Sequence, residues 1–181
     1  MKMKSDQLIK DLMAKVAESA DAAKGFKPLS TEKLNFKQNV DAWSILECIE
    51  HLNLYGDFYL PEIEARILSQ KPDSHTEIFK SGLIGNYFAN LMLVKDGRLK
   101  KMKSPKDKNP ANSVLTLATI ERFLKQMHKL TSLLQQSAKV NLTATKTSIS
   151  ISRQIKLRLG DTFRVLINHI ERHILQAKRN V

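Results

Sequence analysis

The chain contains few of the residues that interrupt regular structure or cross-link a fold. Its 181 residues include six glycines, five prolines and one cysteine, Cys48, and aromatic side chains make up only 6% of it. A single cysteine excludes an internal disulfide, which suits a reducing compartment. Because turn-forming residues are so sparse, we expect a few long helices instead of many short strands.

Long apolar runs are also missing. No stretch approaches the ~18 uninterrupted apolar residues of a transmembrane helix. The N-terminal residues Met1 to Asp6 lack the apolar segment of a signal peptide. We therefore expect a cytoplasmic protein with no membrane partner. With 42% hydrophobic residues, the length suits one domain, residues 1–181, whose core is large enough to be stable alone.

Charge is distributed unevenly along the chain, whose formal net charge is +12. Residues 1–94 carry 11 Lys and Arg against 13 Asp and Glu, whereas residues 95–181 carry 19 against 5. Seven of these basic residues lie between Lys95 and Lys108, with two aspartates, so we expect an exposed loop there. A functional alternative for this loop is a basic lid over an anionic substrate, although the bundle order does not place it near any site.

Apolar residues recur at helical spacing in four long segments, which predict a four-helix bundle with long irregular connectors. The segments are residues 5–24, 43–68, 113–137 and 160–178. Ser44 followed by Glu47 is a capping box, in which each side chain binds the other residue's backbone N–H. Candidate N-caps elsewhere are Ser5 or Asp6 in the first segment and Asp161 or Thr162 in the last.

The connectors are less regular. Residues 28–40 predict a polar connector, and a short helix is expected after Gly85. In residues 141–159 isoleucine and leucine alternate with polar residues, which favours a short strand or an extended strap. Pro61 lies within the second long segment and predicts a kink or a restart there.

Two histidines four apart, His169 and His173, are the first candidate site. This spacing places both imidazoles on one face of a helix, about 6 Å apart along the axis. Such a pair can bind one metal ion, and His51 in the second segment could supply a third ligand. Alternatively, each ring could satisfy itself with a backbone carbonyl or a carboxylate. Packing of the two helices side by side would favour the metal site.

The motif around His51 also resembles a known family. Trp43-Ser44-x-x-Glu47-x-x-x-His51 is similar to the second-helix signature of the DinB family, which includes the YfiT-like metal-dependent hydrolases. The last-helix signature of that family, H-x-x-R-H-x-x-Q, is similar to residues 169–176, in which Arg172 and Gln176 also match. The motifs cover a small part of the chain, whereas the helix pattern fits nearly all of it.

This resemblance implies an all-α, up-down-down-up bundle with a divalent metal, zinc or nickel, held by His51, His169 and His173. Three neutral imidazoles leave a coordination position open, which can activate water for hydrolysis or a small thiol for S-transfer. The implied activity is that of a metal-dependent hydrolase or thiol S-transferase. Its partners would be a small-molecule substrate, including a low-molecular-weight thiol, and a second copy in a homodimer.

Other residues near the motifs have two interpretations each. Glu47 could orient His51 or act as a base, but we rank its role in the capping box above both. Gln176 could bind a substrate or be a surface glutamine. Cys48 could be a fourth ligand or a redox thiol, although a small buried core residue is the simpler role. Trp43 would pack over the helix start, whereas Tyr55 and Tyr59 would line a pocket or fill the core. His75 and His128 have no partners at metal spacing.

A second hypothesis belongs to another class of function. The basic C-terminal half could make the protein a non-enzymatic binding module for nucleic acid or an acidic partner, with purely structural histidines. No zinc finger, helix-turn-helix glycine turn or RNA-binding aromatic motif accompanies the charge. We therefore do not expect nucleic acid to be the partner.

Overall fold

The computed structural model describes residues 1–71, 73–94, 97 and 102–181. Its elements, in chain order, are β1 (Lys2–Lys4), α1 (Ser5–Lys24), α2 (Thr31–Asn35), α3 (Ile45–Leu68), β2 (Ile78–Lys80), α4 (Leu83–Met92), the 3₁₀ turn η1 (Lys106–Lys108), α5 (Leu117–Ser137), β3 (Lys146–Ile149), β4 (Ser152–Arg158) and α6 (Leu159–Lys178). Helices dominate, as the scarcity of turn formers predicts.

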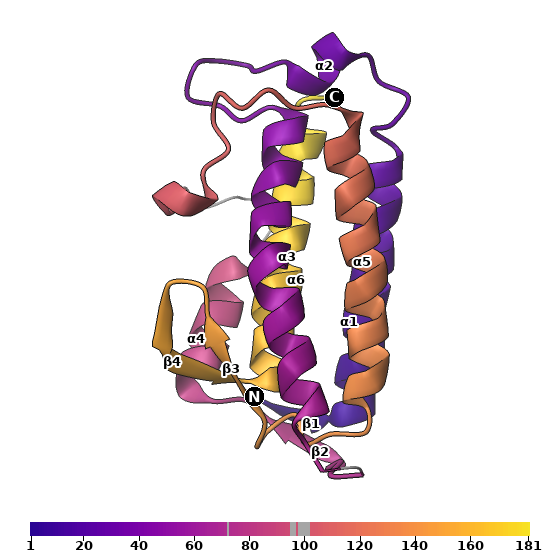
Figure 1. The fold of residues 1–181 in the computed structure, drawn as a ribbon, viewed down its shortest axis with the longest axis vertical. Coiled ribbons are helices and arrows are strands. Elements are labelled where there is room, and N and C mark those ends of the chain that lie inside the picture. The colour runs from indigo at the N-terminus through magenta and orange to yellow at the C-terminus, as the bar shows by residue number, and fades with distance from the viewer. Residues whose placement is uncertain (72, 95–96, 98–101) are drawn as a thin grey trace.

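The four long helices α1, α3, α5 and α6 lie side by side as a bundle (Figure 1). Helix α1 runs away from the end marked N, α3 and α5 both return toward it, and α6 ends beside the marked C-terminus (Figure 1). The expected all-α bundle with up-down-down-up order is therefore confirmed. Within the described residues, no helix combines the length and apolar character needed to cross a membrane.

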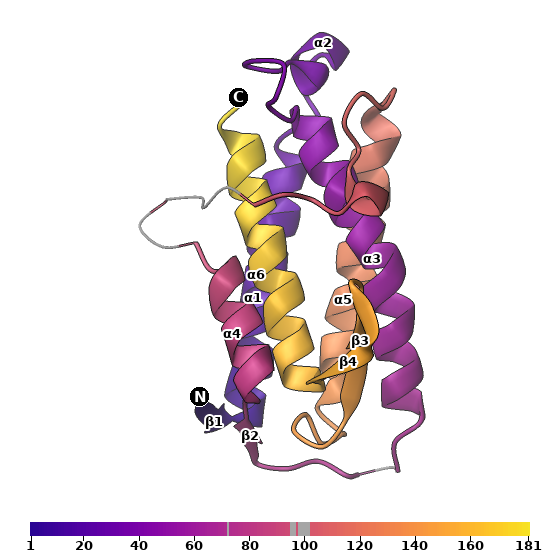
Figure 2. The ribbon, with the colours of Figure 1, turned by 90° about the vertical axis from the view of Figure 1, so that its left-hand side faces the viewer.

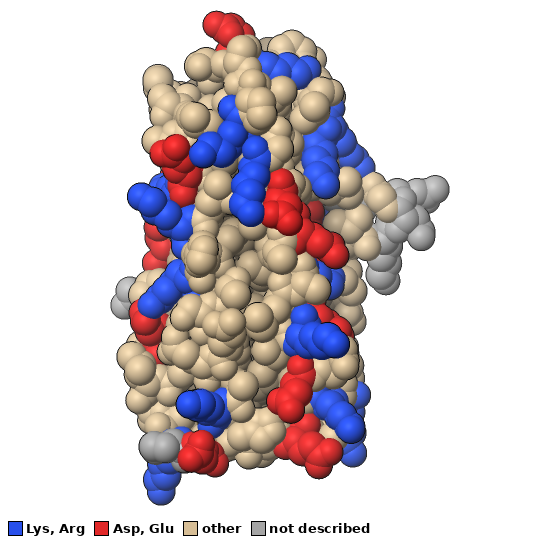
Figure 3. Space-filling model, turned by 90° about the vertical axis from the view of Figure 1, so that its right-hand side faces the viewer, with Lys and Arg blue, Asp and Glu red and all other residues tan. Residues whose placement is uncertain are grey.

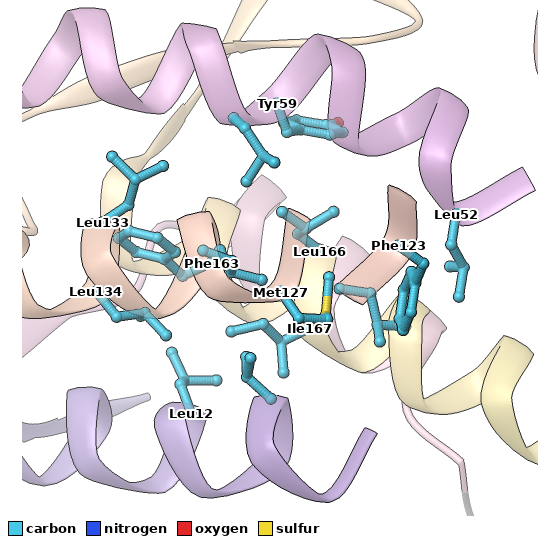
Figure 4. Packing of buried hydrophobic residues seen from close by; sticks show 14 of the residues in the cluster. Leu12, Leu52, Tyr59, Phe123, Met127, Leu133, Leu134, Phe163, Leu166 and Ile167 are labelled. Carbon is cyan, nitrogen blue, oxygen red and sulfur yellow. The ribbon is translucent and has the colours of Figure 1, made fainter. Parts of the chain in front are cut away.

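The core fills the space between these four helices. Figure 4 shows side chains from all four meeting there: Leu12 of α1, Leu52 and Tyr59 of α3, Phe123, Met127, Leu133 and Leu134 of α5, and Phe163, Leu166 and Ile167 of α6. Burying each large apolar side chain contributes about 1.5–3 kcal/mol. This packing fixes which faces of α3 and α6 point toward each other.

Helix α3 begins after the predicted cap and ends at the predicted residue, Leu68. Ser44 Oγ accepts from the Glu47 N–H at 3.1 Å, and Glu47 Oε2 accepts from the Ser44 N–H at 2.9 Å, which confirms the capping box. The predicted restart at Pro61 is wrong, since α3 is continuous to Leu68, whereas the alternative of a kink stays a prediction. Buried side chains on both sides of the proline, including Ile63, keep that turn packed against the core.

The predicted N-caps of the first and last helices are wrong. Ser5 lies inside α1, and its hydroxyl donates to the Thr76 carbonyl at 2.6 Å instead of capping. Lys4 is the N-cap, because β1 pairs antiparallel with β2 and leads directly into the helix. Helix α6 begins at Leu159, so Asp161 falls within its first turn.

Asp161 instead joins α6 to the start of α4. It is fully buried, it accepts from the Gly82 N–H at 2.8 Å, and it pairs with Arg164 at 3.0 Å. Helix α4 begins at Leu83, before the expected start at Gly85. A Cβ at Gly85 would lie 2.5 Å from Asp161, so only glycine permits this close approach. The large apolar residues of α4 that face outward are Leu83, Ile84 and Tyr87.

The segment predicted as a short strand or strap is a two-stranded antiparallel hairpin, β3–β4, with Thr147 opposite Leu157. Strand β3 contacts α3 and α6, and Figure 1 shows the hairpin on the side of α3 that faces away from α5. The Ser148 N–H donates to Glu62 of α3 at 2.8 Å, which ties the hairpin to the bundle.

The other connectors also differ from expectation in detail. A short helix, α2, lies within the predicted polar connector, with Ser30 accepting from the Lys33 N–H. Helix α5 begins at Leu117 and not at residue 113, because the preceding Thr116 has extended backbone. The predicted basic loop falls partly on residues 95, 96 and 98–101, which lie outside the described residues; its last residues form η1.

Candidate metal centre

The three predicted histidines lie on facing sides of α3 and α6, which run next to each other (Figures 1 and 2). His51 is in the second turn of α3, between the buried residues Ile49 and Leu52. His169 and His173 flank buried Ile170 on α6. The apolar stripes that build the core therefore also turn all three imidazoles inward.

The three rings converge on one point. One nitrogen from each ring lies within 4.8 Å of the corresponding nitrogens of the other two. His51 Nε2 and His169 Nε2 are 3.2 Å apart. Two nitrogens bound to the same tetrahedral zinc at ~2.0–2.1 Å would be separated by about 3.3 Å. Two of the rings thus already have the spacing of metal ligands, and the third offers a nitrogen within 4.8 Å of both.

Burial keeps these imidazoles neutral. His51 is 3% exposed, His169 8% and His173 9%. Burial lowers the pKa of His51 to about 4. It also lowers the pKa values of His169 and His173 well below the ordinary range, and the nearby charge of Arg172 acts in the same direction on both. A neutral imidazole is the form that binds a metal.

A backbone carbonyl orients His51. Its Nδ1 lies 2.6 Å from the Lys108 carbonyl oxygen, which can only accept, so Nδ1 carries the proton. The lone pair of Nε2 is therefore directed at the other rings, as in metal sites where a second hydrogen bond fixes the ligand tautomer. The Ser104 hydroxyl donates to the same carbonyl at 3.1 Å and helps to hold it in place.

His173 has a nitrogen without a partner. Its Nδ1 is buried and makes no hydrogen bond to any of the described residues. A buried unpaired nitrogen costs free energy, and each such case in a native protein needs an explanation. The three-imidazole donor set suits zinc, nickel or iron(II). The residues present therefore fit a divalent metal ion.

Aromatic rings enclose the triad. Trp43 lies 4.7 Å from the His51 ring and 5.7 Å from the His173 ring, measured between centroids. Tyr55 lies 4.9 Å from His51 and 4.6 Å from His169. Burial, followed by the neighbouring Tyr59 and Asp107, raises the pKa of Tyr55 to about 12. These rings limit the access of water to the imidazoles.

A surface depression adjoins this enclosure. Its lining residues are Pro105, Asp107, Lys108, Ser150 and Ile151. It lies between η1 and the turn of the β3–β4 hairpin, which are neighbours in both ribbon views (Figures 1 and 2). The described end of the basic segment thus lies beside the triad, a placement that the helix order alone did not predict.

Two of the weaker candidates have structural roles. Both carboxylate oxygens of Glu47 are used: one closes the capping box, and the other accepts from the Asn112 N–H at 2.8 Å and pairs with Lys37 at 2.6 Å. Its capping role is confirmed. Cys48 is fully buried in the core, and burial raises the pKa of its thiol, which leaves it inert. It lies outside the group of possible ligands.

Gln176 and Arg172 of the last-helix motif both lie near the triad. Gln176 is half-buried and lies one turn after His173. Its side-chain hydrogen bond to the His173 ring raises the pKa of His173 and so opposes the effect of burial. Arg172 is 6% exposed. His75 and His128 are exposed, as expected for surface residues.

Sequence reasoning missed the Lys108 carbonyl, since a backbone group leaves no side-chain signal. Tyr55 was named only as a pocket-lining or core residue. Its position four residues after His51, and hence on the same helix face, was the signal that could have placed it against the triad.

Comparison with known proteins agrees with this geometry. The family model of the DinB superfamily matches residues 16–177, nearly the whole chain. No significant match was found among curated proteins or among solved structures. Because the matched region spans α3 and α6 with their three histidines, the chain belongs to the DinB superfamily.

Proposed function

We propose that the protein is a metal-dependent enzyme that binds one divalent ion, zinc or nickel, through His51, His169 and His173. The single observation that carries this proposal is the convergence of the three imidazoles, with one pair of nitrogens at 3.2 Å. When bound, such an ion supplies a Lewis acid, which promotes deprotonation of water for hydrolysis or of a small thiol for S-transfer.

The surrounding residues have defined tasks in this proposal. The Lys108 carbonyl holds His51 in the tautomer that presents Nε2 to the ion. Trp43 and Tyr55 shield the imidazoles from bulk water, which strengthens electrostatic interactions within the site. Arg172 adds positive charge nearby, which favours an anionic group on the bound substrate.

The alternative of purely structural histidines explains less. His51 does satisfy one nitrogen with a carbonyl, as that alternative requires. However, Nδ1 of His173 is buried and has no partner among the described residues. Three buried imidazoles gathered without a carboxylate ligand are better explained by a shared cation.

Elemental analysis of the protein as isolated tests the metal site. We expect about one equivalent of zinc or nickel per chain. His169→Ala or His173→Ala should abolish it, because two remaining imidazoles bind far more weakly than three. His128→Ala is the matched control, since this exposed histidine of α5 lies away from the triad. Metal content that is unchanged in both triad variants would remove the proposal.

An activity screen tests the chemistry separately from the metal. The metal-loaded protein would be assayed against esters, amides and thiol conjugates, with His169→Ala as the inactive reference. Turnover of esters or amides without added thiol supports a hydrolase, whereas turnover only with a small thiol supports an S-transferase. A full metal complement with no turnover of any of these classes would contradict the enzymatic part of the proposal.

A further inference from the structure

The depression between η1 and the hairpin turn opens onto a row of aromatic rings. Three of its lining residues interact with His51, Tyr55 or Tyr59. Lys108 binds His51 through its carbonyl, and the charge of Asp107 acts on Tyr55. The Ser150 N–H donates to the Tyr59 hydroxyl at 3.3 Å. The depression therefore lies beside both the histidine triad and the two tyrosines.

Tyr55 lies against two rings of the triad. Its ring meets His51 and His169 edge-on, at 4.9 and 4.6 Å between centroids. On its other side it stacks on Tyr59, at 6.3 Å and an interplanar angle of 10°.

The two tyrosine hydroxyls differ in their partners. The Tyr59 hydroxyl accepts a hydrogen bond from the Ser150 N–H, and Tyr59 lies on the side of Tyr55 away from the triad. The Tyr55 side chain is half-buried, yet its hydroxyl has no hydrogen-bond partner among the residues that the structure describes. A phenol hydroxyl is both a donor and an acceptor. Tyr55 therefore has an unused donor beside the candidate metal.

We propose that Tyr55 is a substrate-binding residue, whose hydroxyl donates a hydrogen bond to an oxygen of a small carbonyl compound that reaches the triad through the depression. The proposal rests on the proposed function and specifies its substrate class. The depression suits such a compound, because Lys108 and Asp107 form a pair at 3.4 Å that neutralises both charges. Pro105 and the 60% exposed Ile151 add apolar lining.

A ligand-binding assay on the cobalt-loaded full chain tests this role. Acetohydroxamate, a small carbonyl compound that coordinates metals, is titrated while the visible spectrum of cobalt is followed. Tyr55→Phe keeps the ring and removes the donor, and we expect it to raise the Kd for acetohydroxamate about three- to tenfold. Tyr59→Phe is the matched control, and its Kd should stay within about twofold of the unaltered chain. Cobalt content should be the same in all three proteins.

Several outcomes would overturn the inference. An unchanged Kd in Tyr55→Phe, or an equal rise in Tyr59→Phe, shows that the Tyr55 hydroxyl does not bind the probe. Loss of cobalt from Tyr55→Phe shows that Tyr55 supports the metal site instead. If the unaltered chain takes up no cobalt, the proposed function fails and this inference fails with it. Cobalt uptake with an unchanged Kd removes this inference alone.

The route through the depression has its own test. Ile151→Trp narrows the depression without touching the triad, and we expect it to slow the association of acetohydroxamate several-fold. Ile155→Trp is the control, since Ile155 lies on the same hairpin, is 39% exposed and does not line the depression. Equal association rates in both variants would show that the probe arrives by another route.

Discussion

Glu47 illustrates how a side chain in a functional motif can be fully used by structure. Its carboxylate closes the capping box with Ser44, accepts from the Asn112 N–H and pairs with Lys37. It thus joins the start of α3 to the segment that carries the Lys108 carbonyl.

Replacement of Glu47 separates this structural role from a catalytic one. Glu47→Ala removes one half of the capping box and a buried ion pair, so we expect the free energy of unfolding to fall by about 1–3 kcal/mol. Metal content should be unchanged, because the imidazoles supply the ligands. Urea denaturation and elemental analysis measure the two effects. Glu47→Gln should lose less stability, since glutamine also serves in a capping box. Loss of metal at unchanged stability would contradict this explanation.

At the scale of elements, the β3–β4 hairpin is attached to α3 chiefly through Glu62. Glu62 accepts from the Ser148 N–H and pairs with Arg66 on the next turn of α3. Although burial raises the pKa of Glu62, the hydrogen bonds from Ser148 and Arg66 together outweigh it, so the pKa is lowered from the ordinary 4.5. This attachment keeps the hairpin turn beside the depression.

The lowered pKa predicts a pH-dependent contribution to stability. A carboxyl group whose pKa is lower in the folded state stabilises the fold above its ordinary pKa and loses that effect as the pH falls through the folded value. The stability difference between the unaltered chain and Glu62→Gln should be about 1 kcal/mol near pH 7 and should shrink below pH 4.5.

Urea denaturation at several pH values measures the Glu62 effect. Glu64→Gln is a control on the same helix, because its pairing with Lys129 is a more exposed surface ion pair and contributes less. A difference for Glu62→Gln that stays constant from pH 7 to pH 3 would contradict the assigned role.

At the scale of the whole molecule, folding offsets the charge asymmetry of the sequence. Arg122 of the basic half pairs with Glu50 and Asp57 of the acidic half. Lys129 pairs in the same way with Glu64. On the face shown in Figure 3, basic and acidic side chains are interspersed, with no large patch of one sign. The net charge therefore does not define a nucleic-acid surface on this face.

We accordingly expect no specific binding to double-stranded DNA. Phosphate contacts are strongest at low salt, so the test is a titration at ~50 mM salt, followed by one at ~200 mM. The expected result is at most weak binding that disappears at the higher concentration. Tight binding at ~50 mM with a steep salt dependence would support the alternative of a basic binding module.

The sequence by itself determined the helical class, the capping box at Ser44 and the identity of the three histidines. These features depend on local periodicity and on short-range hydrogen bonds, which are visible in neighbouring residues. The same local rules misplaced the N-caps Ser5 and Asp161, because both side chains bind partners about 70 or 80 residues away. Long-range contacts of this kind leave no trace in a single segment.

Only the tertiary structure decided how the candidate site is built around the imidazoles. The orientation of His51 depends on the Lys108 carbonyl, and the enclosure depends on Trp43 and Tyr55 meeting rings of two helices. Every residue carries a backbone carbonyl, so the sequence does not show which one binds His51. The separation of the rings follows from the packing of α3 against α6. The sequence therefore identifies the candidate ligands, and the tertiary structure sets their geometry.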